Sequence, residues 1–503
     1  MASRLTVMML LAVLTTASGA QGKDRVRPTA VAGSFYPGDR ARLEAAVEDF
    51  LETARRPEGA APVAIVAPHA GYVFAGQIIA DAWNQAAGSE YDLIVILGTD
   101  HTQPPFDGVS VYDGTAYDTP LGRAALDQDV IQALLRSDPR FVFKPAVHER
   151  EHSVEVQVPF AQHLFPGVKL VCAVVGRADP GLCTDLGRTL AKVVRGRKVL
   201  LVASSDLSHY PDHETAVRVD RKTLTALASL DPRHFLKVTR QQERTHPDLA
   251  TCACGKAPIM MMMAAAAQMG GHAATVVSYA NSGDTSLGDV ERCVGYGAIR
   301  IDKEGVGPDL AGLPAVSVPP AGHGPLSPAA CRWLLDFARR TLEQYLTSDT
   351  TPLARDYPAE LGRLQGAFVT LTTKGHRLRG CIGHLQSDTP LAVTVGAMTV
   401  QAAVHDSRFA PMTAREIPTV SIEISVLSVP QPVSGPDRII LGRDGVILSK
   451  NGRSAVYLPQ VATEQGWNLE QTLTHLSRKA GLPGDAWRHG ARFQTFQAQV
   501  FAE

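Results

Sequence analysis

Three histidines stand directly after short apolar runs in the first half of this chain, where they could bind one metal ion together. His69 follows the run 63–67, His101 follows 93–97 and His209 follows 199–203. Runs this short, apolar and rich in β-branched residues are typical of strands buried on both faces of a parallel sheet. Ligands of open α/β sheets bind at the carboxyl ends of the strands. Because imidazole is the commonest protein ligand of transition metals, these positions predict a metal site.

A fourth candidate ligand is Cys254, which lies just before the Met- and Ala-rich run 260–269. That run has the composition of a buried helix, and a cysteine at the amino end of a helix is expected to favour its thiolate. Thiolate is the form that binds metal or attacks a substrate. A single loop histidine is more often a hydrogen-bonded structural residue, so the metal prediction depends on the shared position of the histidines at strand ends.

Length and charge limit the classes of function. The chain of 503 residues suggests two to three domains, and its 49 basic and 50 acidic residues almost cancel. No cluster of Lys and Arg with interleaved aromatics is present, which argues against a nucleic-acid partner.

Residues 1–20 combine a basic start, an apolar stretch and small residues before Ala20, which predicts a secretory signal peptide. No later run is apolar for long enough to span a membrane, so we expect a soluble, periplasmic or secreted protein.

The seven cysteines are too few for a disulfide scaffold in a chain this long, and their odd number leaves at least one unpaired. Export permits disulfides, and a disulfide at Cys254 would compete with metal binding. Cys252 and Cys254 are too close in sequence to pair with each other without strain.

The apolar runs are embedded in an alternation of strands and helices. Helices are predicted over 40–53, 74–87, 125–135, 183–195 and 220–229, and two further strands over 275–279 and 293–301. Such alternation predicts an α/β domain with a mostly parallel sheet flanked by helices. Residues 302–328 are rich in Pro and Gly and predict a linker.

The part after the linker predicts an α+β domain. Helices are expected over 328–346, 391–404 and 469–479, and alternating strands over 366–373 and 420–427. Asn451-Gly452 lies between the alternating runs of 443–458 and predicts a hairpin.

Residues 27–301 resemble the Memo family. The resemblance rests on RP at 27–28 with AGSFYP at 32–37, APHAGY at 67–72, GTDH at 98–101, EHSVE at 151–155, SSDLSH at 204–209 and CGKAPI at 254–259. Memo proteins are similar in fold to the class III extradiol dioxygenases, which use non-haem iron. The resemblance implies a metal held by His69, His101 and Cys254, with His209 and Asp206 as candidate acid/base and orienting groups.

Residues 329–503 resemble the AMMECR1 domain, through LRGCIG at 378–383, AA at 402–403, DSRFAP at 406–411 and LPQVA at 458–462. This resemblance implies a fold and no settled activity. Prokaryotic Memo and AMMECR1 proteins are often associated with a radical-SAM protein. A signal peptide would separate this chain from a cytoplasmic partner, which argues against that association here.

The ligand set implied by the resemblance differs from that of the dioxygenases, which use two histidines and a carboxylate. A thiolate suits copper(I) and zinc and also permits iron(II), so iron or copper is expected, with zinc as an alternative. His209 could transfer protons near neutral pH. Glu155 could orient a ligand histidine, ligate the metal itself or be structural, and His152 could likewise be functional or structural.

Arg379 and Cys381 are the candidate functional residues of the second domain. Cys381 could be a nucleophile activated by His384 or His405. The alternative is structural: Gly380 and Gly383 would shape a tight backbone path, and Cys381 would pack as a small apolar group.

The sequence therefore predicts an exported Memo-type metalloprotein, an iron- or copper-dependent oxidoreductase related to extradiol dioxygenases, fused to an AMMECR1 domain. The alternatives are a non-catalytic module that binds a peptide or small molecule in the strand-end cleft, and a metal carrier.

Overall fold

The first domain is built on an eight-stranded mixed sheet with helices on both faces. The computed structural model describes residues 25–305, 307–313 and 324–503, so the predicted signal peptide lies outside the described residues. The strand order is β10-β11-β2-β9-β3-β8-β4-β7. The strands are β2 Ala64–Ala67, β3 Leu93–Thr99, β4 Val109–Val111, β7 Phe141–Val142, β8 Lys169–Val175, β9 Val199–Ser204, β10 Ala273–Asn281 and β11 Gly295–Asp302.

The centre of this sheet is parallel, as the apolar runs predict. Strands β2, β9, β3 and β8 pair in parallel, whereas β10, β11 and β4 add antiparallel pairings toward the edges. All residues of β2, β3 and β9 are buried. Because β2, β9 and β3 are neighbours, the histidine-bearing loops that follow them emerge side by side at one edge.

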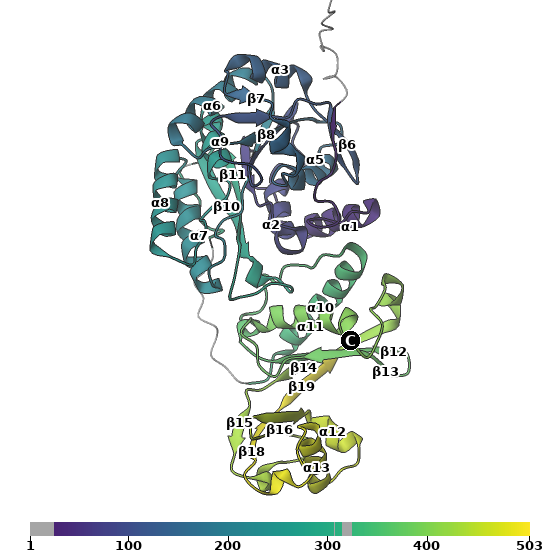
Figure 1. Ribbon diagram of the computed structural model, residues 1–503. Coiled ribbons are helices and arrows are strands. Elements are labelled where there is room, and N and C mark those ends of the chain that lie inside the picture. The colour runs from purple at the N-terminus through teal and green to yellow at the C-terminus, as the bar shows by residue number, and fades with distance from the viewer. Residues whose placement is uncertain (1–24, 306, 314–323) are drawn as a thin grey trace, which may run out of the picture.

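Helices cover both faces of the sheet, and Figure 1 shows them around the β-strands of the upper domain. Three smaller strands form a separate sheet. The helices are α1 Arg40–Glu52, α2 Tyr72–Asn84, α3 Gln128–Ser137, α4 Pro145–Glu149, α5 Val158–Leu164, α6 Pro180–Val193, α7 His213–Ala228, α8 Pro232–Thr245 and α9 Lys256–Gln268, and the small sheet is β1 Val26–Arg27, β5 Ala116–Thr119 and β6 Gly122–Ala125.

Side-chain caps explain why two helices, α6 and α7, begin earlier than the hydrophobic pattern predicts. The pattern predicts helix α7 only over 220–229, but it begins at His213 because Asp212 accepts a hydrogen bond from the Thr215 amide. Helix α6 begins at Pro180 after Asp179, which accepts from the Leu182 amide. Helix α8 has no counterpart among the predicted helices. Most of its residues are polar, but Asp231 caps it and Phe235 and Leu236 bury its apolar face.

The second domain has the predicted α+β character. Its two four-stranded sheets have the orders β13-β12-β14-β19 and β15-β18-β16-β17. Its elements are α10 Pro328–Ser348, β12 Ala367–Thr373, β13 Arg377–Gly383, α11 Leu391–Val404, β14 Val420–Leu427, β15 Gln431–Val433, β16 Gly445–Lys450, β17 Arg453–Tyr457, α12 Pro459–Glu464, α13 Leu469–Lys479, β18 Arg492–Phe496 and β19 Ala498–Ala502. The predicted hairpin is β16–β17, and both Asn451 and Gly452 have the positive φ of its two-residue turn.

A segment of the second domain, residues 349–357, docks on the first domain. Leu353 packs against the core of the first domain. The Nη1 of Arg355 lies 2.6 Å from Oδ2 of Asp81, whose side chain is 0% exposed. Arg55 and Asp356 form a second, more exposed ion pair across the same boundary. The two domains are therefore joined by specific contacts as well as by the connecting chain.

Part of the segment predicted as a linker contacts the first domain. The amide of Val276 in β10 donates to the carbonyl of Asp309, and the amide of Gly312 donates to the carbonyl of Val276. Residues 314–323 lie outside the described part of the chain. Within residues 25–305, 307–313 and 324–503, none of the helices combines the length and the apolar character that a bilayer span requires.

Candidate metal site

His69 follows β2 and is held with its Nε2 free to bind a metal. Its Nδ1 lies 3.0 Å from Oγ of Ser204. That hydroxyl gives its single proton to the carbonyl of Ser153, so Nδ1 of His69 must be the donor in their hydrogen bond. Burial lowers the pKa of His69 well below its usual value, with help from the imidazoles of His152 and His101. The neutral ring therefore directs the lone pair of Nε2 toward Cys254, whose Sγ lies 3.0 Å away.

His101 follows β3 and is oriented by a carboxylate. Its Nδ1 lies 3.0 Å from Oε1 of Glu151, and its backbone amide donates to Oε2 of the same residue. Burial alone would lower the pKa of His101, but hydrogen bonds to Cys254 and Glu151 raise it to about 10. Burial alone would raise the pKa of Glu151, but His101 lowers it to about 2. Glu151 thus fixes Nδ1 of the ring as a donor, the usual arrangement of a metal-binding histidine, and a metal ion would take the place of the proton on Nε2.

Cys254 approaches the histidines from the start of α9. The residue after it, Gly255, precedes the helix, and a Cβ at that position would lie 2.5 Å from the carbonyl oxygen of Ser204. Glycine therefore lets this loop pack against the end of β9. Burial raises the pKa of the Cys254 thiol despite the opposing hydrogen bond with His101. The expected stabilisation of the thiolate by the helix end is thus outweighed by burial, and a metal cation would favour the thiolate.

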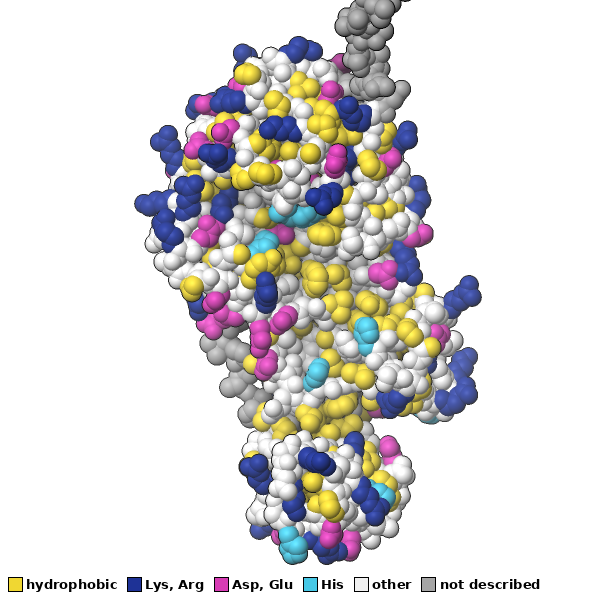
Figure 2. Space-filling view, in the orientation of Figure 1, with side chains coloured by type: hydrophobic (Ala, Val, Ile, Leu, Met, Phe, Trp, Pro, Cys, Tyr) yellow, Lys and Arg dark blue, Asp and Glu magenta, His cyan; other side chains and the backbone are white. Residues whose placement is uncertain are grey.

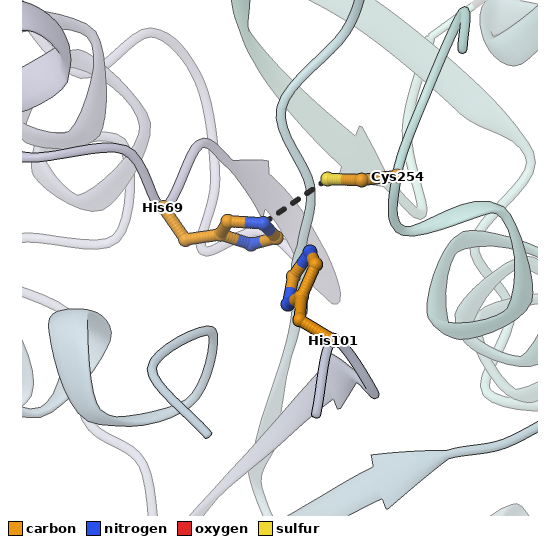
Figure 3. Close-up of side chains that lie close together, drawn as sticks. All are labelled: His69, His101 and Cys254. Atoms are coloured by element: carbon orange, nitrogen blue, oxygen red, sulfur yellow. Dashed lines mark hydrogen bonds between the residues drawn. The ribbon is translucent and has the colours of Figure 1, made fainter. Parts of the chain in front are cut away.

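These three side chains come together as the sequence predicts. Their ligand atoms all lie within 4.8 Å of one another, and the rings of His69 and His101 meet edge to face with centroids 5.1 Å apart. Figure 3 shows both rings turned toward Cys254. All seven cysteines are free, so no disulfide competes at Cys254. Two imidazole nitrogens and one sulfur in this geometry fit a transition metal ion.

His209 and Asp206 border the same cluster, and their ligand atoms with that of Cys254 form a second group within 4.8 Å. The Nδ1 of His209 lies 3.0 Å from the carbonyl of Leu207, which can only accept. The Nε2 of neutral His209 is therefore a proton acceptor. Asp206 accepts hydrogen bonds from the backbone amides of His69 and Ala70 through Oδ1. It holds the loop that carries His69.

A pocket of about 460 Å³ opens beside the cluster. His152 lies in its wall with its ring stacked on that of His101, 4.6 Å between centroids. Apolar side chains form much of the remaining wall: Phe35, Phe74, Leu287, Val294 and Tyr296. In Figure 2, histidine side chains are visible on the upper domain above a band of hydrophobic side chains. The pocket can thus admit a small molecule or a side chain next to the metal ligands.

Glu155, in contrast, does not face this cluster. Its oxygens accept hydrogen bonds from the amides of Ala30 and Val31, from the hydroxyl of Tyr36 at 2.6 Å, and from the guanidinium of Arg27. Its side chain is 0% exposed. Of the roles left open by the sequence, these contacts favour the structural one.

Arg379 and Cys381 lie on β13 of the second domain. Arg379 pairs with Glu416, and the Cys381 thiol accepts from Oγ1 of Thr370. Among the described residues, neither His384 nor His405 forms a hydrogen bond with that thiol. A Cβ on Gly380 would lie 2.0 Å from the carbonyl oxygen of Ala402. The glycine thus permits close packing of α11 on β13, which favours the structural interpretation of this motif.

Sequence reasoning missed two residues that support the site. Glu151 stands in the EHSVE motif, and its position directly before His152 was the available signal. Asp220 accepts from the amide and hydroxyl of Ser208 and from the hydroxyl of Tyr279. Burial raises the pKa of Asp220 to about 7. It supports the loop that carries His209, and no sequence pattern links it to that loop.

Replacing Glu151 by glutamine tests its orienting role. The amide keeps the size of the side chain but removes the charge that fixes the proton on Nδ1 of His101. We expect metal affinity to fall by about 10- to 100-fold, the usual effect of losing such a partner. Competition with a chromophoric chelator measures this affinity. Gln substitution at Glu149, which is exposed, is the control and should leave affinity unchanged; equal affinities in both variants would contradict the role.

The fold and the cluster define an α/β protein with a histidine–cysteine group at the carboxyl edge of its sheet, followed by an α+β domain. Residues 27–300 match the model of the Memo-like proteins, and residues 335–501 match that of AMMECR1. The chain belongs to the Memo family and carries an AMMECR1 domain, which confirms both resemblances.

Two MEMO1 family relatives agree with the assignment to the Memo family. A MEMO1 family protein of Pyrobaculum aerophilum is 33% identical over 285 residues, covering 55% of this chain and 98% of the relative. A MEMO1 family protein of Desulfurococcus amylolyticus is 33% identical over 291 residues, covering 54% of this chain and 98% of the relative. The crystal structure of an uncharacterised protein from Pyrococcus horikoshii is 36% identical, covers 34% of this chain and 90% of its own, and has a TM-score of 0.33. The first two relatives are each covered over nearly their whole length.

Proposed function

We propose that this protein is an exported Memo-type metalloprotein that binds one transition metal ion through His69, His101 and Cys254. The observation that carries the proposal is the hydrogen bonding of the two imidazole rings, those of His69 and His101. The Nδ1 atoms of His69 and His101 are occupied by Ser204 and Glu151, while their Nε2 atoms and Sγ of Cys254 lie together. Both histidines thus present the same nitrogen, Nε2, to the sulfur of Cys254, and a metal ion would replace the protons shared there.

The proposed activity is that of an iron- or copper-dependent oxidoreductase, with zinc as the alternative metal. Bound iron or copper would supply one-electron redox chemistry. A small molecule or peptide side chain would occupy the pocket against Phe35 and Phe74. His209 would accept a proton at Nε2, because its Nδ1 is already a donor to Leu207. Asp206 would keep the His69 loop in place through its two backbone hydrogen bonds.

Metal analysis of the full chain tests the proposal. The protein and its His69→Ala and Cys254→Ala variants are purified anaerobically with defined metals, and bound metal per chain is counted. We expect stoichiometric metal in the unmodified protein and its loss in both variants. Cys252→Ala is the matched control, because Cys252 is two residues away and its thiol donates to the carbonyl of Thr239. That variant should keep its metal.

The alternatives predict different results. A metal-free, folded protein that still captures ligands would reject the metal site in favour of a binding module. Metal that transfers readily to an acceptor, with no oxygen consumption on any substrate tried, would indicate a carrier.

The proposed export depends on residues 1–20, and fractionation of cells that express the chain with and without them tests it.

A further inference from the structure

The pocket wall is completed by a segment that contacts the AMMECR1 domain. Residues 282–294 connect β10 to β11, and their part 282–292 supplies Ser282, Leu287, Gly288, Asp289 and Arg292 to the pocket. In Figure 1 the chain after β10 runs toward α10 and α11 of the second domain. The outer side of the pocket wall is therefore the side that meets the second domain.

The contact is tight at one glycine. Gly396 lies within α11, and a Cβ built on it would lie 2.3 Å from Oγ of Ser286 and 2.9 Å from Cε1 of Phe337. Ser286 is 6% exposed, and its hydroxyl has no hydrogen-bond partner within the described ranges. Ser286 thus packs closely against α11, and only a glycine at position 396 allows that distance.

Burial and, to a smaller extent, the carboxylate of Asp284 in the pocket segment raise the pKa of Tyr357 in the docked segment. Asp284 in turn accepts from Nε2 of His213 and from the amide of Asn281. These two hydrogen bonds fix the beginning of the pocket segment to the Memo domain.

A small set of hydrogen bonds holds the rest of the segment, among them those from the amide of His213 to the carbonyl of Val290 and from the amide of Glu291 to the carboxylate of Asp289. The amide of Gly288 donates to the carbonyl of Thr285, and the thiol of Cys293 donates to the carbonyl of Asp289. Helix α11, by comparison, is buried along most of its length. If a larger side chain at position 396 strains the contact, we expect the segment to move before helix α11 does.

We propose that the AMMECR1 domain holds the pocket wall of the Memo domain in place, with Gly396 and Ser286 as positioning residues. The proposal depends on the pocket and not on the metal. It assigns the second domain a function within the same chain. The docked AMMECR1 domain determines the shape of the Memo pocket.

Hydrogen exchange of the metal-free full chain tests this. In Gly396→Ala, the added methyl group should displace the segment, and the hydrogen-bonded amides within 285–292, chiefly those of Thr285 and Gly288, should exchange about tenfold faster or more. Exchange in β3 should not change. Adding Ser286→Ala removes the oxygen nearest to the new methyl group and should restore slow exchange. This rescue distinguishes the contact from a general loss of stability.

Ala397→Gly is the matched control, because it weakens α11 without adding an atom toward Ser286. Exchange of 285–292 that is unchanged in Gly396→Ala, equally fast in Ala397→Gly, or not restored by Ser286→Ala would overturn the proposal. If Gly396→Ala does not fold, Ser286→Thr adds a methyl group from the other side of the contact and should speed the same amides. Because the protein is metal-free, failure of the metal proposal would not affect this result.

Discussion

Replacing Glu155 by alanine is expected to destabilise the Memo domain by about 3–5 kcal/mol, since it leaves the buried guanidinium of Arg27 with backbone carbonyl acceptors and no carboxylate. The side chains of Arg27 and Glu155 are 3% and 0% exposed. The hydroxyl of Tyr36 and the amides of Ala30 and Val31 lose their acceptor as well. A loss of this size is a large share of the stability of a typical domain. Urea denaturation followed by tryptophan fluorescence measures it.

Two variants sharpen this prediction. Glu214→Ala removes the partner of Arg218 in an exposed pair with N–O distance 3.0 Å, and it should cost about 1 kcal/mol or less. Glu155→Gln keeps the shape of the side chain but not its charge, and its loss of unfolding free energy should lie between those of Glu155→Ala and Glu214→Ala. A Glu155→Ala protein of unchanged stability that had lost its metal would instead make Glu155 a ligand.

Replacing Arg355 by alanine is expected to weaken the docking of the two domains by about 3 kcal/mol, the lower end of the cost of breaking a buried ion pair. Asp81 is fully buried and would lose its only ionic partner among the described residues. It would keep hydrogen bonds from the amide of Arg55 and the hydroxyl of Ser278. Those two bonds explain why we expect the lower value. Calorimetry should show one unfolding transition separating into two.

Arg55→Ala is the matched control at the same boundary. Its pair with Asp356 has side chains that are 43% and 64% exposed. Exposed pairs contribute about 0–1 kcal/mol, so this variant should unfold almost as the unmodified protein does. Equal effects of the two substitutions would show that burial of Asp81 does not decide the strength of docking. Faster exchange of 285–292 in Arg355→Ala alone would connect docking to the pocket wall.

Local sequence was sufficient for most elements of the fold. The expected helices over 391–404 and 469–479 and the strand over 420–427 agree with α11, α13 and β14 at both ends. Their hydrophobic periodicity and their Gly and Pro boundaries are local signals. Helix α8 was missed because its apolar face is narrow and most of its residues are polar.

The candidate metal site was predictable for a different reason. Parallel strands that are neighbours in a sheet end at the same edge, so residues directly after β2, β3 and β9 must lie close together. The position of Cys254 also depended on the resemblance to a known family. Its spacing from the histidines in sequence carries no such information.

The two acidic residues of the EHSVE motif show what the sequence could not distinguish. Glu151 and Glu155 are similar in type and close in sequence, yet Glu151 orients His101 while Glu155 pairs with Arg27. The backbone between them turns into a short 3-10 helix at Glu155–Gln157 and directs the two carboxylates to different partners. Which partner each one finds is a property of contacts between distant segments.

The amino-acid sequence by itself determined the two domains, most of their elements and the histidines that meet at the sheet edge, because strand and helix patterns are set by neighbouring residues. Only the tertiary structure decided which carboxylate serves the histidines, that Arg355 reaches the buried Asp81, and that Gly396 lies against Ser286. These contacts join residues far apart in the chain. They arise from how the packed elements face one another, which no local pattern records.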